Sequence, residues 1–305
     1  ISQSLRNQRP DEIPHLFAYS QLLLSINGHE GRYGTCNTPA KFWAAWREED
    51  ISDAEMYALK NKKLSASQKQ SLFSYRPVDD LNWYENLIAG GDLAVTGQDQ
   101  LLISLLKPER LLEMVRLYTL FDKKAGKIVA RYQQIFGIKR LIERISTKNS
   151  KGGREGGVIW HTTGSGKSFT MVFLSKAMIL HETLKKCRIL VVTDRVDLED
   201  QLSKTFVSGG ELTGKRDKQN AMATSGKRLA EQIGKGTERI MFSLIQKFNS
   251  ATKLPECVNT SSDFIVLIDE GHRSQGGENH VRMKLALPNA AFVAFTGTPL
   301  LKDEK

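Results

Sequence analysis

The chain has 305 residues, about the length of two domains, and 44 lysine and arginine residues against 34 aspartate and glutamate give it a net charge of +10. No apolar run reaches the roughly 20 residues that a membrane-spanning helix needs, and the three cysteines, Cys36, Cys187 and Cys257, lack the spacing of a disulfide framework or a metal site. Membrane-spanning and disulfide-stabilised secreted proteins are therefore excluded, and we expect a cytoplasmic protein without membrane contact. The basic surplus suits a polyanionic partner such as nucleic acid.

The first hundred residues predict short, irregular elements. Residues 22–26 are interpreted as a buried strand that ends at the turn Asn27-Gly28, and residues 31–35 allow a second short strand. The aromatic segment 42–46 is interpreted as a core anchor, with a stacking platform for nucleic-acid bases as the alternative.

A helical pattern of leucines begins near residue 101 and continues to residue 121, on both sides of Pro108. Because proline interrupts a helix, this pattern predicts two helices, or a strand and a helix. Residues 122–127 are expected to form a charged turn, and residues 128–145 to resume the helical pattern. We place the domain boundary in this region, with one domain over residues 1–110 and a second over residues 111–305.

Residues 156–168 have the order strand, phosphate-binding loop and helix start; their sequence is GGVIWHTTGSGKS. The glycines allow the backbone to curl so that successive N–H groups point inward, as a triphosphate requires. Lys167 is expected to reach the β- and γ-phosphates of ATP, and the Ser168 hydroxyl to bind Mg²⁺. His161 stands where the usual pattern has its first glycine, and an ordinary glycine turn is the alternative. The expected nucleotide-binding residues are Thr163, Gly164, Ser165, Gly166, Lys167 and Ser168.

Continuous apolar runs follow the loop at residues 188–193, 239–242, 264–268 and 291–295. Such runs are typical of strands that are buried on both faces, and helical stretches separate them. The pattern predicts an α/β fold in which a parallel sheet carries helices on both faces. Residues 209–236 are basic and rich in glycine, and we interpret them as a solvated insertion or flexible loop, with a DNA contact as the alternative.

An acidic motif, Asp269-Glu270-Gly271-His272, follows the run at residues 264–268 directly. A carboxylate at the carboxyl end of a parallel strand lies where such sheets bind ligands. Asp269 is expected to hold Mg²⁺, and Glu270 to orient and deprotonate the water that attacks the γ-phosphate. The alternative is an ordinary helix start with acids near its positive end.

Two threonines after the last strand, Thr296 and Thr298, are expected to hydrogen-bond back to the acidic motif. Together with His272 they form a candidate coupling set that passes the state of the nucleotide to another surface.

These motifs resemble the first motor domain of superfamily 2 helicases and translocases. More closely, residues 161–168 (HTTGSGKS), 193–201 (TDRVDLEDQ) and 269–275 (DEGHRSQ) resemble the restriction (R) subunit of type I restriction-modification enzymes. That family usually has alanine where Gly271 stands, which is an exchange of one small residue for another. The resemblance covers most of the chain.

The resemblance implies a RecA-like motor domain over residues 111–305, with the second RecA-like domain and its arginine beyond Lys305. Residues 1–110 would be the trailing part of an α/β restriction-nuclease domain and its connector, because residues 12–21 and the pair Gly34-Thr35 resemble the region just after the nuclease core. No Asp and Glu-x-Lys set at a convincing spacing precedes Glu12, so no nuclease residue is assigned.

The resemblance also implies contacts outside the phosphate loop. Residues 131–134 (RYQQ) are similar to the family's segment in which a glutamine reads the adenine edge; we choose Gln134, and Gln133 or a plain surface glutamine remain alternatives. Arg195 and Gln201 are candidate contacts to the DNA backbone, and a helix-end ion pair is the alternative for Arg195.

The function implied is that of an ATP-dependent DNA translocase and type I site-specific deoxyribonuclease. With ATP and Mg²⁺, the whole protein would move duplex DNA past bound methyltransferase (M) and specificity (S) subunits before cleaving it, while residues 1–305 alone would turn over ATP poorly. The alternatives are another superfamily 2 DNA helicase or translocase without a nuclease, and a non-catalytic nucleotide-binding module.

Overall fold

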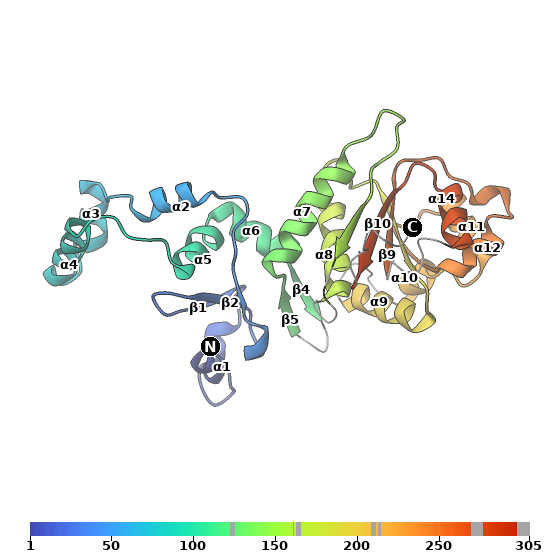
Figure 1. Cartoon of the computed structure of the whole chain (residues 1–305). Helices are drawn as coiled ribbons and strands as arrows, with labels where there is room; N and C mark the ends of the chain where they lie inside the picture. Colours follow the sequence, from blue (N-terminus) through green and yellow to red (C-terminus); the bar gives the residue numbers. More distant parts are fainter. Residues whose placement is uncertain are drawn as a thin grey trace. The chain divides into compact units, whose positions relative to one another are not determined.

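The computed structural model describes residues 1–122, 126–160, 162, 166–208, 212, 215–269 and 277–297. It divides into two compact units, Ile1–Val115 and Arg116–Lys305 (Figure 1). None of the helices in these described ranges is long and apolar enough to cross a membrane.

The first unit contains a three-stranded antiparallel sheet, in the order β1-β2-β3, and a set of short helices. The expected pair of strands is confirmed, although β1 is half-buried and not buried. The elements are α1 (Ser2–Asn7), the 3₁₀ turn Pro14–Phe17, β1 (Leu23–Ile26), β2 (Gly31–Gly34), the 3₁₀ turn Ala40–Phe42, β3 (Ala44–Ala45), α2 (Asp53–Lys60), α3 (Ala66–Phe73), α4 (Val78–Ala89), α5 (Gly97–Leu105) and α6 (Pro108–Leu117).

Local side-chain bonds explain why the first hairpin turns where the sequence indicated. The Asn27 carboxamide oxygen accepts hydrogen bonds from the backbone N–H groups of His29 and Glu30, and Gly28 has a φ of +94°. Asparagine forms such turns readily, and glycine takes a positive φ without steric cost.

The aromatic segment after the hairpin is part of the core of the first unit. Trp43 and Trp46 are only 3% and 4% exposed. The Arg110 guanidinium lies 5.4 Å from the centre of the Trp46 ring and forms ion pairs with Glu48 and Asp50. The interpretation of this segment as a core anchor is therefore right for both tryptophans.

Two helices lie on either side of the loop that contains Lys107, as the leucine pattern predicted. Pro108 is the first residue of α6, a position at which its missing N–H costs nothing.

The expected helix over residues 128–145 is wrong at its start, because Ile128 lies in a hairpin of β4 (Thr119–Asp122) and β5 (Gly126–Val129). α7 (Tyr132–Ser146) begins only after Arg131, where the Gln134 side chain caps the helix. Residues 123–125 of the expected turn lie outside the described residues.

The second unit is built on a five-stranded parallel sheet in the order β6-β10-β9-β7-β8. All five strands fall where the apolar runs predicted them, so the α/β fold class is confirmed. Their bounds are β6 (Gly157–Trp160), β7 (Arg188–Thr193), β8 (Ile240–Leu244), β9 (Phe264–Asp269) and β10 (Ala291–Thr296).

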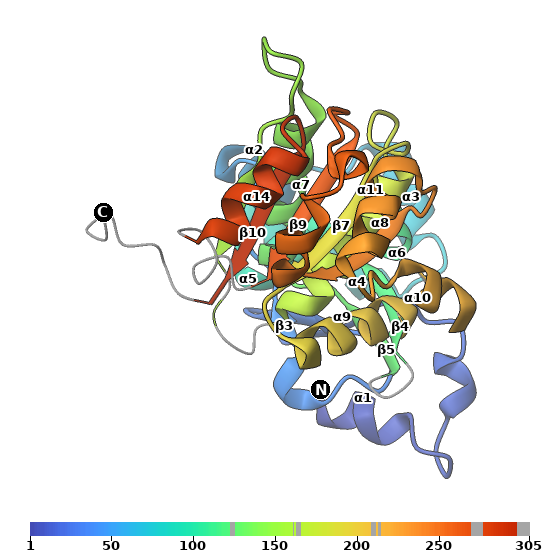
Figure 2. The same ribbon diagram turned by 90° about the vertical axis from the view of Figure 1, so that its right-hand side faces the viewer.

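Helices cover both faces of this sheet (Figures 1 and 2). One face packs against α11, α12 and α14 through a buried cluster that includes Leu190, Val266 and Met283. On the other face Phe242 contacts Phe206 of α9, with ring centres 5.2 Å apart. The helices are α7, α8 (Lys167–Leu180), α9 (Val196–Ser208), α10 (Lys215–Ala221), α11 (Gly226–Lys235), α12 (Phe248–Ala251) and α14 (Glu278–Ala286).

The interpretation of residues 209–236 as a flexible loop is wrong over most of their length. Residues 215–235 contain α10 and α11, and Leu229, Ala230 and Ile233 are fully buried against the sheet. These apolar residues recur at helical spacing, and Ser225 caps the helix by accepting a bond from the Arg228 N–H. Gly226 and Gly234 lie in the same helix, and because glycine lowers helix propensity the sequence does not indicate a helix clearly. Residues 209–211 and 213–214 lie outside the described residues.

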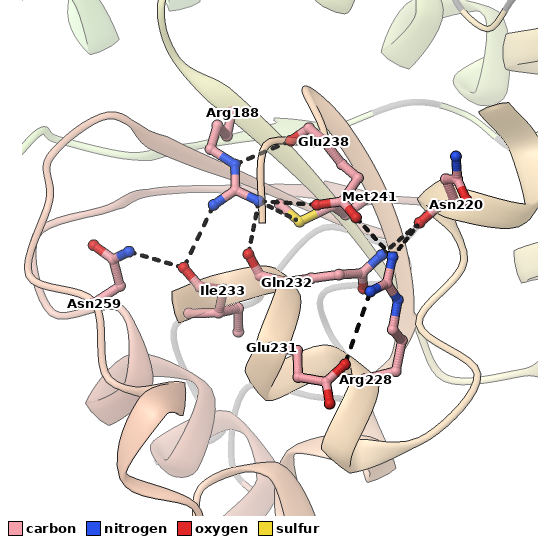
Figure 3. A network of polar contacts seen from close by, with 9 residues as sticks. All are labelled: Arg188, Asn220, Arg228, Glu231, Gln232, Ile233, Glu238, Met241 and Asn259. Carbon is pink, nitrogen blue, oxygen red and sulfur yellow. Dashed lines mark hydrogen bonds and ion pairs between the residues drawn. The ribbon is translucent and has the colours of Figure 1, made fainter. Parts of the chain in front are cut away.

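A polar network fixes the end of α11 to the sheet (Figure 3). Arg188, the first residue of β7, donates from Nη2 to the Gln232 carbonyl at 2.7 Å and from Nε to the Glu238 carbonyl at 3.0 Å. Glu238 also accepts a 2.7 Å bond from Arg228. The Gln232 carbonyl also accepts a bond from the Gly236 N–H, so the guanidinium adds a second bond at the last turn of α11 and positions this helix against β7.

Arg188→Leu should therefore destabilise the second unit by about 2 to 3 kcal/mol, because it removes hydrogen bonds to the carbonyls of Gln232 and Glu238 and the ion pair with the Glu238 carboxylate. Urea denaturation measures this change. Arg239→Ala is the matched control, since Arg239 is exposed and its side chain makes a 3.5 Å contact to the Ile179 carbonyl, the one hydrogen bond of this side chain to the described residues. Equal stability of the two variants would contradict the capping role.

Two glycines beside β6 should respond to alanine in opposite directions. A Cβ at Gly156 would lie 1.9 Å from the Phe292 carbonyl oxygen, whereas one at Gly137, inside α7, would meet nothing within 4 Å. Gly156→Ala should cost about 3 kcal/mol or more by displacing β6 from β10, and Gly137→Ala should add up to about 1 kcal/mol through helix propensity. Thermal unfolding of both variants tests this, and a harmless Gly156→Ala would contradict the packing.

Candidate nucleotide site

The carboxyl ends of three strands meet at one edge of the sheet. Thr296 of β10 is in register with Trp160 of β6, and Phe295 is in register with Asp269 of β9. The loop that leaves β6 therefore starts beside the acidic motif and the end of β10. Parallel sheets bind ligands at this edge.

Gly166 ends the phosphate loop and begins α8. It has a φ of +94° and a ψ of 33°, a left-handed conformation that suits glycine, and it is the N-cap residue of the helix. Lys167 and Ser168 form the first turn of α8. The N–H groups of a first helical turn lack intrahelical acceptors and carry a partial positive charge, so this turn is a suitable anion site.

Lys167 and Asp269 form an ion pair across the strand ends. The distance from Lys167 Nζ to Asp269 Oδ1 is 2.8 Å, and the two side chains are 20% and 5% exposed. The pair joins the start of α8 to the end of β9, two elements that are far apart in the sequence. A cation of the phosphate loop and a carboxylate of the acidic motif are thereby brought together.

Gln134 lies beside the same turn, but its carboxamide contacts protein. Its Oε1 accepts a 2.8 Å bond from the Arg131 N–H, and its Nε2 donates to the Gly166 carbonyl at 3.3 Å and to Thr170 Oγ1 at 2.8 Å. Sequence reasoning did not identify Thr170. The available signal was a threonine four residues after Gly166, where a hydroxyl can bond a preceding helical carbonyl.

A cavity of about 830 Å³ opens between α7 and β6. Gln133 and Gln134 line it together with three arginines, Arg131, Arg140 and Arg144. The Trp160 ring, which is 60% exposed, lies at its β6 side. A cavity with basic groups and an aromatic surface suits an anionic or aromatic ligand.

The two candidate DNA contacts are solvent-accessible. Arg195 and Gln201 are exposed at the carboxyl end of β7 and on α9. Among the described residues Arg195 forms no ion pair; the DNA contact and the helix-end ion pair both stay predictions. Arg154, by contrast, is buried and donates to the carbonyls of Ile145 and Ser262 at 2.8 Å.

Several predicted site residues lie outside the described residues: Thr163, Gly164, Ser165, Glu270, His272 and Thr298. Thr296 is described, and it is 1% exposed at the end of β10. In the part of the chain with assigned structure, no group of three or more His, Cys, Asp or Glu side chains is placed to hold a metal ion.

The buried cysteines are not suited to nucleophilic chemistry. Burial raises the pKa of Cys257 to about 11, and it also raises the pKa of Cys187. A thiol with a raised pKa contains little of the reactive thiolate at neutral pH. Both residues are therefore interpreted as packing residues.

Residues 133–305, more than half of the chain, match the family model of the SWI2/SNF2 ATPase. The chain belongs to the SWI2/SNF2 ATPase family. The matched region starts in α7 and includes the phosphate loop, the acidic motif and all five parallel strands.

Curated relatives of this SWI2/SNF2 ATPase confirm the resemblance to type I restriction R subunits. The type I restriction enzyme HindI endonuclease subunit of Haemophilus influenzae is 32% identical over 97% of this chain and 26% of its own length. The putative type I restriction enzyme MjaIXP endonuclease subunit of Methanocaldococcus jannaschii is 30% identical over 95% of this chain and 26% of its own length. The chain thus spans about a quarter of the length of these relatives.

Among solved structures, the SWI2/SNF2 ATPase core of Sulfolobus solfataricus in complex with dsDNA has a TM-score of 0.43 to this chain. It is 14% identical over 62% of this chain and 35% of that chain.

Asp269→Asn should destabilise the nucleotide-free SWI2/SNF2 ATPase by about 2 kcal/mol, because it removes the carboxylate charge opposite the Lys167 ammonium in a partly buried pair. Urea denaturation without nucleotide measures the effect. Asp200→Asn is the control, since Asp200 pairs with Lys204 and Lys218 at the surface, where solvent screens the charges. A loss no larger than that of the control would show that the pair does not stabilise the strand edge.

Proposed function

We propose that this chain is the first RecA-like motor domain of a type I restriction R subunit, preceded by the trailing part of its nuclease domain. The whole protein would couple ATP hydrolysis to movement of duplex DNA and would then cleave that DNA. The ion pair of 2.8 Å between Lys167 and Asp269 supports this proposal most directly, because it joins the phosphate loop to the acidic motif at the ligand-binding edge of the sheet.

The residues of this edge fit ATP and Mg²⁺. Mg²⁺ usually takes one or two carboxylates and otherwise binds phosphates and water, so a metal cluster made of protein side chains is not required. Asp269 and the Ser168 hydroxyl are oxygen ligands of the kind it prefers, and the first turn of α8 offers N–H groups to phosphate. When bound, Mg²⁺ would supply positive charge against the charge that develops on the transferred phosphoryl group.

Each residue of the proposed site would have a separate role in ATP hydrolysis. Lys167, which contacts Asp269 in the structure, would bind the β- and γ-phosphates, and the Asp269 carboxylate would then hold the metal ion. Glu270 orients the attacking water and accepts its proton. Thr296, with His272 and Thr298, passes the state of the nucleotide to the DNA-binding surface. A second RecA-like domain supplies the arginine that stabilises the transferred charge.

The DNA would be held by its phosphates. Arg195 and Gln201 are exposed at the same strand edge as the nucleotide site, and the chain has a net charge of +10. Contacts to phosphate position a protein on duplex DNA without reading its sequence. The target sequence would then be read by the specificity subunit of a complex that also contains a methyltransferase subunit.

The nuclease assignment for residues 1–110 rests on sequence similarity. The relatives carry the name endonuclease subunit, and the Haemophilus influenzae protein matches 97% of this chain. The second candidate function is a DNA helicase or translocase without a nuclease. Cleavage of circular duplex DNA by the full-length protein, together with its methyltransferase and specificity subunits, distinguishes the two.

DNA-stimulated ATP hydrolysis by the full-length protein tests the proposed site. Lys167→Ala and Glu270→Gln should each lower turnover roughly 100-fold or more, because each removes an interaction that is made in the transition state. Lys235→Ala, an exposed lysine at the end of α11, is the matched control and should leave turnover unchanged. Stimulated turnover that survives both site substitutions would disprove this assignment.

A further inference from the structure

We propose that one face of β6 and the adjoining side of α14 form a docking site for an amphipathic helix from another part of the full-length chain. This helix carries a carboxylate among its apolar side chains. We call the site the β6–α14 surface, and its exposed apolar residues are Val158, Val281 and Leu285. It serves the assembly of the full-length protein, beyond the function proposed for the nucleotide site.

Among the described residues, helices cover only one face of β6. α7 packs on that face, where a Cβ at Gly157 would lie 3.3 Å from the Leu141 side chain. Val158 points to the opposite face, as does its register partner Ala294 of β10. Phe292, two residues before Ala294, packs there against the buried cluster of α11, α12 and α14. Val158 is nevertheless 53% exposed. Strands of a parallel sheet are ordinarily covered on both faces, so β6 lacks one cover.

The layer of helices on this side of the sheet consists of α11, α12 and α14, which contact one another in that order (Figure 2). Val281 and Leu285 of α14 are four residues apart, so they share one side of the helix, and they are 57% and 66% exposed. Lys284 lies beside them and borders the same cavity as Val158. The exposed apolar strip of α14 therefore lies on the side of this helix that is next to β6.

A cavity of about 250 Å³ lies between α14 and this face of β6. Its walls are mostly apolar and come from β6, β9 and β10, with Val158, Ile268, Phe292 and Ala294 among them. Two polar side chains of α14, His280 and Lys284, also border it. An apolar cavity beside exposed apolar side chains is suited to receive the side chains of a partner.

The polar groups at this cavity indicate the charge of the occupant. His280 is 6% exposed, and its Nδ1 is buried without a hydrogen-bond partner among the described residues. Burial and the charge of Lys284 lower the pKa of His280, so its ring is neutral and has one N–H to donate. Lys284 is exposed and forms no ion pair with any residue of the described ranges. A carboxylate can accept hydrogen bonds from both side chains.

The size of the surface favours an occupant from the same chain. Three exposed apolar side chains and a small cavity offer less area than the roughly 800 Å² per partner of a stable interface between separate proteins. A helix of the same chain is present at a high effective concentration, so a smaller contact is sufficient to hold it. This chain spans 26% of the length of the two endonuclease subunits, so most of each relative lies outside the matched region.

The test uses the purified full-length protein, alone and with its methyltransferase and specificity subunits. The photo-crosslinking amino acid p-benzoylphenylalanine replaces Leu285 in one variant and Val281 in another, and mass spectrometry identifies the crosslinked peptides. The control carries it in place of Val258, which is 55% exposed and lies between α12 and β9. Amide hydrogen exchange of the crosslinked segment is then measured for Leu285→Glu and Lys284→Glu, with Val258→Glu and Lys284→Arg as matched controls.

Both positions on α14 should crosslink within one chain to a single segment outside residues 1–305, and Val258 should not. That segment should have apolar residues at helical spacing with an aspartate or glutamate among them. Leu285→Glu buries a charge in the contact and Lys284→Glu repels the carboxylate, so each should accelerate amide exchange in the segment by about tenfold or more. Lys284→Arg and Val258→Glu should leave exchange at the wild-type rate.

The proposal is overturned if Leu285 and Val281 crosslink to a second copy of the chain, to another subunit, or to no segment outside residues 1–305. It is also overturned if Leu285→Glu leaves exchange in the crosslinked segment as in the wild type. If the glutamate variants do not fold, the crosslinks decide the question. A wild-type protein without ATP turnover would refute the proposed function alone, because the crosslinks do not depend on catalysis.

Discussion

The ion pair between Lys167 and Asp269 is the constraint on which the candidate site depends. Burying the Lys167 ammonium or the Asp269 carboxylate without a partner of opposite charge would cost free energy. Their contact holds the start of α8 against the end of β9. The parallel register of β6, β10 and β9 makes this contact possible, because it ends the three strands at one edge. The pair compensates both charges at the proposed nucleotide site.

The surrounding structure makes that edge rigid. β9 and β10 are buried on both faces, and the sheet packs against α11, α12 and α14 on one side, so the ends of these two strands have little room to move. Arg188 fastens α11 to β7 through helix-terminal carbonyls. Gln134 connects α7 to α8 in a similar way. Its side chain accepts a hydrogen bond from the Arg131 N–H at the start of α7 and donates one to the Gly166 carbonyl at the start of α8. Polar side chains at helix ends thus position the elements that carry the site.

Much of this protein could be predicted from the sequence because the signals are local. A continuous apolar run such as residues 188–193 is typical of a strand that is buried on both faces. Gly166 followed by Lys167 has the residue types and order of a phosphate-binding loop. The helix α11 is not predicted because its two glycines lower helix propensity, whereas burial of Leu229 and Ile233 overrides this effect. Ile128 was assigned to a helix although it pairs with Leu120 in a hairpin.

The sequence by itself determined the order of the strands along the chain, the residues of the phosphate loop and acidic motif, and the family. Only the tertiary structure decided how these meet. The order β6-β10-β9-β7-β8 places Lys167 beside Asp269, and the packing of α7 against α8 buries the Gln134 carboxamide on Gly166 and Thr170. Contacts between residues far apart in the chain depend on register and packing, which no local pattern of residues specifies.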